Sequence, residues 1–287
     1  ASSEITPYYK NFIKFTIKSK FSRESPFPPA SQSMKSADTI RPSPNNQLIK
    51  EGDLVKIEIG AHVDGFAAFA AHTIVVQSDA KAPVTGKKAD VILAAYKAAQ
   101  AALRLIKPGN FNNQVTDAIK KVCDSYEVSP LEGVLSHDLK KHLIDGNKVI
   151  INKETFEQKV DDQEFQVNDV FALDVFAAVA TEKPKGRFAL IQAEVRTNVY
   201  KRSLDRSYNL KIKQSRQFFN DVLGRYPSFC FSMNSFEDPN VARLGLKECL
   251  EHELLVPYPV IVEKPGAFVA QFKFTVMVTK GKTTALT

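Results

Sequence analysis

Two long apolar segments restrict the folds that this chain can adopt. Residues 170–180 read VFALDVFAAVA and residues 267–279 read AFVAQFKFTVMVT, and a charged side chain interrupts each of them, Asp174 in the first and Lys273 in the second. Segments that are apolar on both faces are typical of strands inside a sheet that helices cover. We therefore predict an α/β fold built around these two strands.

The sequence between residues 54 and 126 predicts a β-hairpin followed by two helices. Residues 54–60 alternate between apolar and charged side chains, and Asp64-Gly65 favours a tight turn into the apolar run at 66–76. The first helix ends at Pro108-Gly109 and the second starts at Asn113. Their apolar stripes are Val91, Ala95, Ala98, Ala102 and Leu105, and then Val115, Ile119, Val122 and Tyr126.

Composition along the chain predicts its organisation. Residues 1–50 form a basic N-terminal segment rich in Pro and Ser, and its second half cannot sustain a helix. Residues 51–287 form the main domain, within which residues 197–257 are predicted to be a helical insert. One insert helix carries the apolar positions between 218 and 226, and the other is opened by Asp238-Pro239.

Length and composition exclude several classes of protein. A chain of 287 residues, 44% of them hydrophobic, buries a sizeable core without a metal or a disulfide. No stretch contains 18 strongly apolar residues, so we expect no membrane span. Cys123, Cys230 and Cys249 are far apart and form no C-x-x-C pair, which favours a reducing compartment and argues against a zinc ribbon.

Charged residues in apolar surroundings are the candidates for chemistry. A buried charge is costly unless it is paired, hydrogen-bonded or bound to a cation, and Asp174 and Lys273 both face this cost. Together with Glu58 and His137, Asp174 supplies the residue types of a hard-metal or metal-hydroxide site. The alternative is that each has a structural role. His137 and His142 do not have the spacing of the helical H-E-x-x-H pair of zinc proteases.

Several long motifs resemble those of the proliferation-associated, ErbB-receptor-binding protein family. They are KEGDLVKIEIGAHVDGFAAFAAHTIVV, LSHDLKKHLIDG, VFALDVF and ECLEHELLVPYPVIVEKPGAFVAQFKFTVMV. The family is related to the type 2 methionine aminopeptidases, so the resemblance implies their pita-bread fold, a curved antiparallel sheet flanked by helices, with a helical insert at 197–257. The N-terminal helices and the basic C-terminal tail that are usual in the family have no counterpart in this sequence.

The resemblance also assigns the positions at which the peptidase relatives hold two metal ions through five ligands. Their two aspartates correspond to Glu58 and Phe69, their histidine to His137, and their two glutamates to Asp174 and Lys273. A phenyl ring cannot ligate a hard cation and an ammonium group repels one, so the resemblance implies no catalytic residues, no metal and no other cofactor. We expect Lys273 to supply the positive charge instead, paired with Asp174 and with Glu58.

Basic residues gather in two places and are the candidate RNA contacts. Contacts from Lys and Arg to phosphates supply most sequence-independent affinity for nucleic acid, although a solvated surface is the alternative for any charge cluster. Tyr200, Tyr208 and Phe218 either stack on bases or pack the core of the insert. The two clusters are Arg196, Lys201, Arg202, Arg206, Lys211, Lys213 and Arg216 in the insert, and Lys10, Lys14, Lys18, Lys20 and Arg23 near the N-terminus.

The members of the family that the sequence resembles bind RNA and associate with ribosomes. The resemblance therefore implies a monomeric, catalytically inactive protein whose partners are ribosomal RNA, other structured RNA and proteins of the large ribosomal subunit. We expect it in the cytoplasm, with a nuclear or nucleolar pool and no membrane association. A protein-interaction adaptor or transcriptional co-regulator is one alternative hypothesis, and a metallo-aminopeptidase with an altered site is another.

Overall fold

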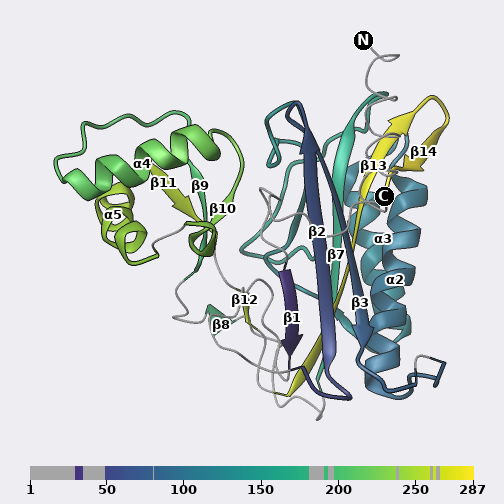
Figure 1. The fold of residues 1–287 in the computed structure, drawn as a ribbon. Helices are drawn as coiled ribbons and strands as arrows, with labels where there is room; N and C mark the ends of the chain where they lie inside the picture. Colours follow the sequence, from purple (N-terminus) through teal and green to yellow (C-terminus); the bar gives the residue numbers. More distant parts are fainter. Residues whose placement is uncertain are drawn as a thin grey trace. The chain divides into compact units, whose positions relative to one another are not determined.

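The structure is a computed structural model that describes residues 30–34, 49–79, 81–180, 191–192, 197–236, 239–258, 261–262 and 266–287. Two compact units contain these residues (Figure 1). The first unit comprises residues 29–193 and 261–287, and the second comprises residues 194–260. The second unit therefore contains the predicted insert at 197–257, while most of the predicted segment at 1–50 lies outside the described residues.

A nine-stranded sheet forms the first unit, and every pair of neighbouring strands in it is antiparallel. The order is β1-β2-β3-β13-β7-β5-β6, with β14 added to β13 and β4 added to β7. A separate two-stranded ribbon pairs β8 (Ile191–Gln192) with β12 (Ile261–Val262). The strands of the large sheet are β1 (Ala30–Met34), β2 (Leu54–Val63), β3 (Phe66–Val75), β4 (Ser129–Pro130), β5 (Leu135–Asp138), β6 (Val149–Ile151), β7 (Val170–Ala180), β13 (Ala267–Thr279) and β14 (Lys282–Ala285).

The two predicted central strands are confirmed, and each begins and ends at the predicted residues. β7 and β13 cover residues 170–180 and 267–279, and they pair with each other from Ala267 opposite Ala180 to Met277 opposite Val170. The predicted hairpin is also confirmed, because β2 and β3 pair along their full length around Asp64-Gly65. Both turn residues have positive φ, which a glycine adopts without strain and an aspartate tolerates.

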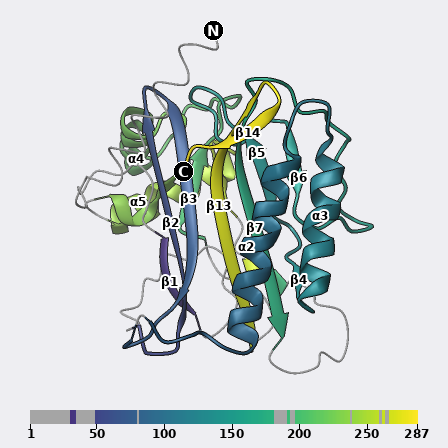
Figure 2. The ribbon, with the colours of Figure 1, turned by 90° about the vertical axis from the view of Figure 1, so that its right-hand side faces the viewer.

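Two helices, α2 (Lys87–Leu105) and α3 (Asn112–Ser125), cover one face of this sheet (Figure 2). Both were predicted, and α3 starts one residue earlier than expected. The face of α2 toward the sheet is made almost wholly of alanine, and such small side chains let the helix approach β7 and β13 closely. The buried residues of α2 are Val91, Ala94, Ala95, Ala98, Ala99 and Ala102.

From Lys56 onward, the alternation in β2 does not bury its apolar residues. Ile57 and Ile59 are 37% and 48% exposed, whereas Lys56 is only 3% exposed. Lys56 and Glu58 lie on the face of the sheet opposite the helices, where Lys56 approaches Phe176 and Glu58 contacts Lys273. This face must satisfy charged groups rather than exclude them.

The second unit contains the two predicted helices together with a small sheet that the sequence did not predict. Its strands β9 (Val199–Arg202), β10 (Phe231–Ser232) and β11 (Leu255–Pro257) pair in the order β10-β9-β11. The predicted helices are present as α4 (Lys213–Arg225) and α5 (Pro239–Glu251), and a 3-10 turn covers Met233–Ser235. None of the helices in the described part of the chain is long and apolar enough to cross a membrane.

Gly245 in α5 and Gly224 in α4 provide a matched test of how these two helices pack. A Cβ at Gly245 would lie 2.6 Å from Cβ of Phe218 and 3.0 Å from the carbonyl oxygen of Gln214, whereas a Cβ at Gly224 would meet nothing within 4 Å. We expect Gly245→Ala to lower the free energy of unfolding by about 1 to 3 kcal/mol, because the neighbours must move. Gly224→Ala should leave it unchanged or raise it by up to about 1 kcal/mol. Denaturant titration measures both, and equal effects would contradict the close approach.

Candidate functional site

Three of the five positions that the resemblance assigns to metal ligands meet on the sheet face opposite the helices, and they are Glu58, Lys273 and Asp174. Glu58 in β2 lies opposite Ala71 in β3, Ala71 lies opposite Lys273 in β13, and Lys273 lies opposite Asp174 in β7. Residues that face each other across antiparallel strands project to the same side of the sheet. The register therefore aligns three charged side chains in one row across four strands.

Lys273 is the centre of this row. Its Nζ donates to Oε1 of Glu58 at 2.7 Å and to Oδ2 of Asp174 at 2.8 Å. The side chains of Lys273, Glu58 and Asp174 are 15%, 23% and 12% exposed, so all three are largely shielded from water. The predicted pairing of Lys273 with Asp174 and Glu58 is confirmed.

Gln271 completes the network, and the sequence reasoning missed it. Its Nε2 donates to Oδ1 of Asp174 at 3.0 Å and to Oε2 of Glu58 at 3.3 Å. Each carboxylate therefore accepts one hydrogen bond from an ammonium group and one from an amide. The signal was present in the sequence, because Gln271 lies two residues before Lys273 and so projects from the same face of β13.

Two threonines hold β3 and β13 around this network. Between these strands only Lys273 with Ala71 and Phe274 with Ala70 form ladder pairs. On one side, Oγ1 of Thr73 donates to the carbonyl of Gln271 and accepts from its N–H, both at 2.8 Å. On the other side, Oγ1 of Thr275 accepts from the N–H of Phe69 at 2.7 Å and donates to its carbonyl at 2.9 Å. The threonines thus replace ladder bonds and fix the backbone that carries Gln271 and Phe69.

One aromatic ring lies near each of the two ammonium groups on this face, those of Lys273 and Lys56. Nζ of Lys273 lies 5.1 Å from the ring centroid of Phe69, and Nζ of Lys56 lies 5.7 Å from that of Phe176. A cation within about 6 Å of a ring centroid is attracted by the negative face of the ring. Phe69, at a position assigned to a metal ligand, therefore contributes to holding the ammonium group of Lys273.

Glu58, Asp174 and Lys273 shift one another's pKa values. Burial opposes ionisation of Glu58, but Lys273, the hydrogen bond from Gln271 and nearby Lys56 outweigh it and hold the pKa of Glu58 below its ordinary value. Burial raises the pKa of Asp174, and Glu58 adds to this rise although Lys273 opposes it. Burial also opposes the charge on Lys273, yet Asp174 and Glu58 outweigh it and raise the pKa of Lys273 above its ordinary value. Lys273 therefore stays protonated throughout the neutral range.

The residues present do not fit a pair of metal ions. The ammonium group of Lys273 already occupies hydrogen-bonding distance from both carboxylates, so a cation there would meet a fixed positive charge. Phe69 offers only a hydrocarbon ring, which is no ligand for a hard cation. The residues at this site therefore favour the ammonium group of Lys273 over a metal ion.

His137 lies on the same sheet face but takes no part in the network that the described residues form. It pairs with Ala172 in β7, which is two residues from Asp174 and so projects to the same side. Its Nδ1 lies 3.2 Å from the carbonyl oxygen of Gly146. This contact orients the half-buried imidazole toward the loop that follows β5.

The basic candidates of the insert differ in how much of their charge is available. Arg206 pairs with Glu253 at 2.9 Å, and Arg202 donates to the carbonyl of Pro227 at 3.2 Å. Nη1 of Arg216 donates to the carbonyls of Leu210 and Lys211 at 3.0 and 2.9 Å. Arg196, Lys10, Lys14, Lys18, Lys20 and Arg23 lie outside the described residues.

Lys211, Lys213 and Arg216 form what we call the basic edge, at the start of α4. All three side chains are exposed, and within the described residues none of them is in an ion pair. Tyr200 and Phe218 are 6% and 2% exposed, which places them in the core of the second unit rather than at a surface for bases. Tyr208 is half-buried and stacks on His252, with ring centroids 3.5 Å apart.

Comparison with known proteins identifies the scaffold. Residues 8–200 match Metallopeptidase family M24. The chain belongs to this family. ERBB-3 binding protein 1 of Solanum tuberosum is 42% identical over 94% of this chain and 66% of its own length, and proliferation-associated protein A of Dictyostelium discoideum is 43% identical over 82% and 59%. The resemblance to the proliferation-associated, ErbB-receptor-binding proteins is thereby confirmed.

A third relative carries a different name. It is called curved DNA-binding protein, comes from Schizosaccharomyces pombe, and is 39% identical over 84% of this chain and 61% of its own length. The chain thus spans 59 to 66% of the length of these three relatives.

Solved structures confirm the pita-bread fold of the family. A thermophilic Arx1 matches with a TM-score of 0.80 and 25% identity over 96% of this chain and 78% of that chain. Methionine aminopeptidase from Rickettsia prowazekii matches with a TM-score of 0.54 and 14% identity over 88% and 71%. The M24 chain described here thus combines this fold with an ammonium group and a phenyl ring at two of the positions that the resemblance assigns to metal ligands.

Removing the charge of Lys273 tests the network. Lys273→Met leaves two largely buried carboxylates side by side, so we expect the free energy of unfolding at pH 7 to fall by about 3 kcal/mol. Without Lys273 the hydrogen bond from Gln271 is the main contact left to oppose the burial that raises the pKa of Asp174. A carboxyl whose pKa is higher in the folded state makes folding more favourable as pH falls. The loss should therefore shrink between pH 7 and pH 5, which denaturant titrations at the two pH values measure.

Two further variants make this test specific. Lys273→Met combined with Asp174→Leu should recover part of the loss, because one of the two unpaired carboxylates is then absent and the other, Glu58, still has Gln271 and Lys56 nearby. Lys247→Met removes an 82% exposed lysine that pairs with Glu251 at 3.9 Å, and it should change the free energy of unfolding by less than about 0.5 kcal/mol. An unchanged stability of Lys273→Met would mean that its ammonium group is solvated.

Proposed function

We propose that this chain is an M24 protein without peptidase activity that binds structured RNA and associates with ribosomes. The proposal depends mainly on the basic edge. There the ammonium groups of Lys211 and Lys213 are exposed and form no ion pair with other described residues. Exposed cations of this kind are what phosphate groups require. The proposed partners are ribosomal RNA and proteins of the large subunit.

The state of the ligand positions supports the first half of the proposal. Peptide hydrolysis in a two-metal site needs carboxylates that bridge the ions and a metal-bound water that attacks. In this chain Glu58 and Asp174 instead bind Lys273 and Gln271, so neither carboxylate is available to bridge cations. The network replaces the chemistry of the site with a structural role.

The name of one relative and the family resemblance of the sequence support the proposed binding to RNA and ribosomes. One relative is called curved DNA-binding protein, which points to nucleic acid as a ligand class within this group of proteins. The resemblance of the sequence to a family that associates with ribosomes points to RNA rather than DNA. Because both nucleic acids present phosphates, the experiment must compare them directly.

The proposal predicts that the chain does not release methionine from peptides. Purified protein incubated with a Met-Ala-Ser peptide should give no more free methionine than buffer, with cobalt, manganese or zinc added, because Lys273 excludes the cations from the site. Mass spectrometry of the peptide measures the outcome.

A positive result has to be traced to this site before it counts. Metal-dependent release that persists through repeated purification and disappears in both His137→Ala and Asp174→Asn would overturn the proposal. Release that survives both substitutions would come from a contaminating peptidase.

The proposal also predicts a salt-dependent role for the basic edge. Lys211→Ala combined with Lys213→Ala should weaken binding to a structured ribosomal RNA fragment by about tenfold. The slope of log affinity against log salt should become shallower by up to about 2, because each lost phosphate contact removes about one unit. Fluorescence anisotropy at several salt concentrations measures both quantities.

Controls separate the edge from charge in general. Lys120→Ala combined with Lys121→Ala removes the same charge from the exposed side of α3 and should leave the affinity and the slope unchanged. A DNA duplex of matched sequence should bind more weakly than the RNA. If the basic-edge variant binds and co-sediments with ribosomes as well as the unaltered protein does, the edge is a solvated surface and the proposal fails.

A further inference from the structure

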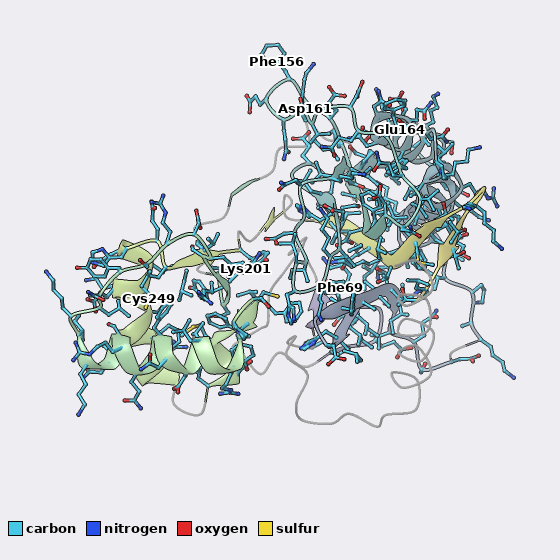
Figure 3. The ribbon with its side chains drawn as sticks, turned by 90° about the horizontal axis from the view of Figure 1, so that it is seen from above. Phe69, Phe156, Asp161, Glu164, Lys201 and Cys249 are labelled. Carbon is cyan, nitrogen blue, oxygen red and sulfur yellow. The ribbon has the colours of Figure 1, made fainter. Side chains whose placement is uncertain are left out.

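The loop at residues 153–164, between β6 and β7, exposes a phenylalanine at its tip. Phe156 is 96% exposed, and no other large hydrophobic side chain of the described residues exceeds the 65% of Leu244. Figure 3 shows Phe156 at the outer end of the loop, with Asp161 and Glu164 nearer the sheet. Phenylalanine is among the residues most often buried, and a ring that is almost wholly exposed offers nearly its whole apolar area to another molecule.

The base of this loop is firmly attached to the first unit. The side-chain amide of Asn112, at the start of α3, donates to the carbonyl of Asp161 at 2.9 Å and accepts from the N–H of Gln163 at 3.0 Å. Phe165, which is buried, donates its N–H to the carbonyl of Asn110 at 2.9 Å. The end of the loop that returns to β7 is therefore anchored to the segment that begins α3.

The tip of the loop has its own hydrogen bonds. The N–H of Thr155 donates to the carbonyl of Gln158 at 3.1 Å, and the N–H of Gln158 donates to Oγ1 of Thr155 at 3.1 Å. These bonds close a turn around Phe156 and Glu157. A side chain that is held out by a closed turn loses less conformational entropy on binding than one on an open loop.

The loop is anionic on a chain whose net charge is +7. Five of its twelve residues are acidic and two are lysines. Both lysines are paired within the first unit, Lys153 with Glu132 at 2.6 Å and Lys159 with Glu154 at 3.5 Å. Four exposed carboxylates keep no ion pair within the described residues, and they are Glu157, Asp161, Asp162 and Glu164.

We propose that this loop docks a basic protein surface, with the ring of Phe156 entering an apolar pocket on the partner. The ring supplies the apolar anchor, and the four carboxylates supply a field that selects positive charge around the pocket. The same field repels phosphates, so nucleic acid and anionic lipid are not the ligand. The proposal does not rest on RNA binding, because it uses a different surface with the opposite charge.

Site-specific photo-crosslinking in living cells identifies the partner. The full chain carries p-benzoylphenylalanine in place of Phe156, and a matched chain carries it in place of Leu244. We expect the first to give an adduct that protease removes and nuclease does not, with a basic protein that the second does not capture. An adduct with RNA, with an acidic protein, with a second copy of this chain, or no adduct at all overturns the proposal.

Affinity measurements with the captured protein, expressed and purified, then test the chemistry. Phe156→Ala should lower the affinity at least tenfold without changing the melting temperature, because the ring makes few contacts within its own chain. Asp161→Asn combined with Asp162→Asn should weaken binding mainly at low salt, as screening predicts. The paired Lys159→Ala variant makes the loop more acidic and should not weaken binding. An affinity that Phe156→Ala leaves unchanged overturns the proposal.

Discussion

The face of the sheet opposite the helices depends on the ion pairs that the ammonium group of Lys273 makes with Glu58 and Asp174. Moving an isolated ion from water into a protein interior costs several kcal/mol even after relaxation, so neither carboxylate of this site is tolerable there alone. Lys273 contacts both of them, and Gln271 fills a remaining acceptor on each. Two negative charges therefore share one strong cation, with Lys56 adding a weaker contribution to Glu58. A metal pair would have met the same electrostatic need while leaving open positions for chemistry.

The geometry of the sheet makes this exchange possible. β7 and β13 pair over eleven residues. Helix α2 packs its alanine face against the side of these two strands that the helices cover. The backbone pairing of β7 and β13 sets Lys273 opposite Asp174. Hydrogen bonds from Thr73 and Thr275 hold β3 beside β13. Because the pairing of β7 with β13 runs through the backbone, the same fold can carry different side chains at the positions that the resemblance assigns to metal ligands. The TM-score of 0.54 with a methionine aminopeptidase, at only 14% identity, shows that this fold is shared by chains that differ in most of their residues.

How much the sequence predicts depends on whether the determining interaction is local. The boundaries of β7 and β13 and the stripes of α2 and α3 follow from periodicity, because each depends on neighbouring residues. The pairing of Lys273 with Asp174 follows from the cost of burying either one. The short strands of the second unit have two to four residues and leave no periodic pattern. The pairing of Arg206 with Glu253 is also invisible, since the two residues are distant in sequence.

The start of α4 shows why the basic edge would recognise charge rather than sequence. The carboxylate of Glu248, which lies on α5, accepts the N–H groups of Lys211 at 2.7 Å and Ile212 at 3.2 Å. Backbone donors at a helix N-terminus otherwise bind an external anion, so Glu248 already fills that role from within. An incoming phosphate is left with the ammonium groups of Lys211 and Lys213, which are point charges on flexible stems. Contacts of this kind attract any suitably shaped phosphate backbone and carry no information about bases, so discrimination among ligands has to come from their shape or from a second contact elsewhere on the chain.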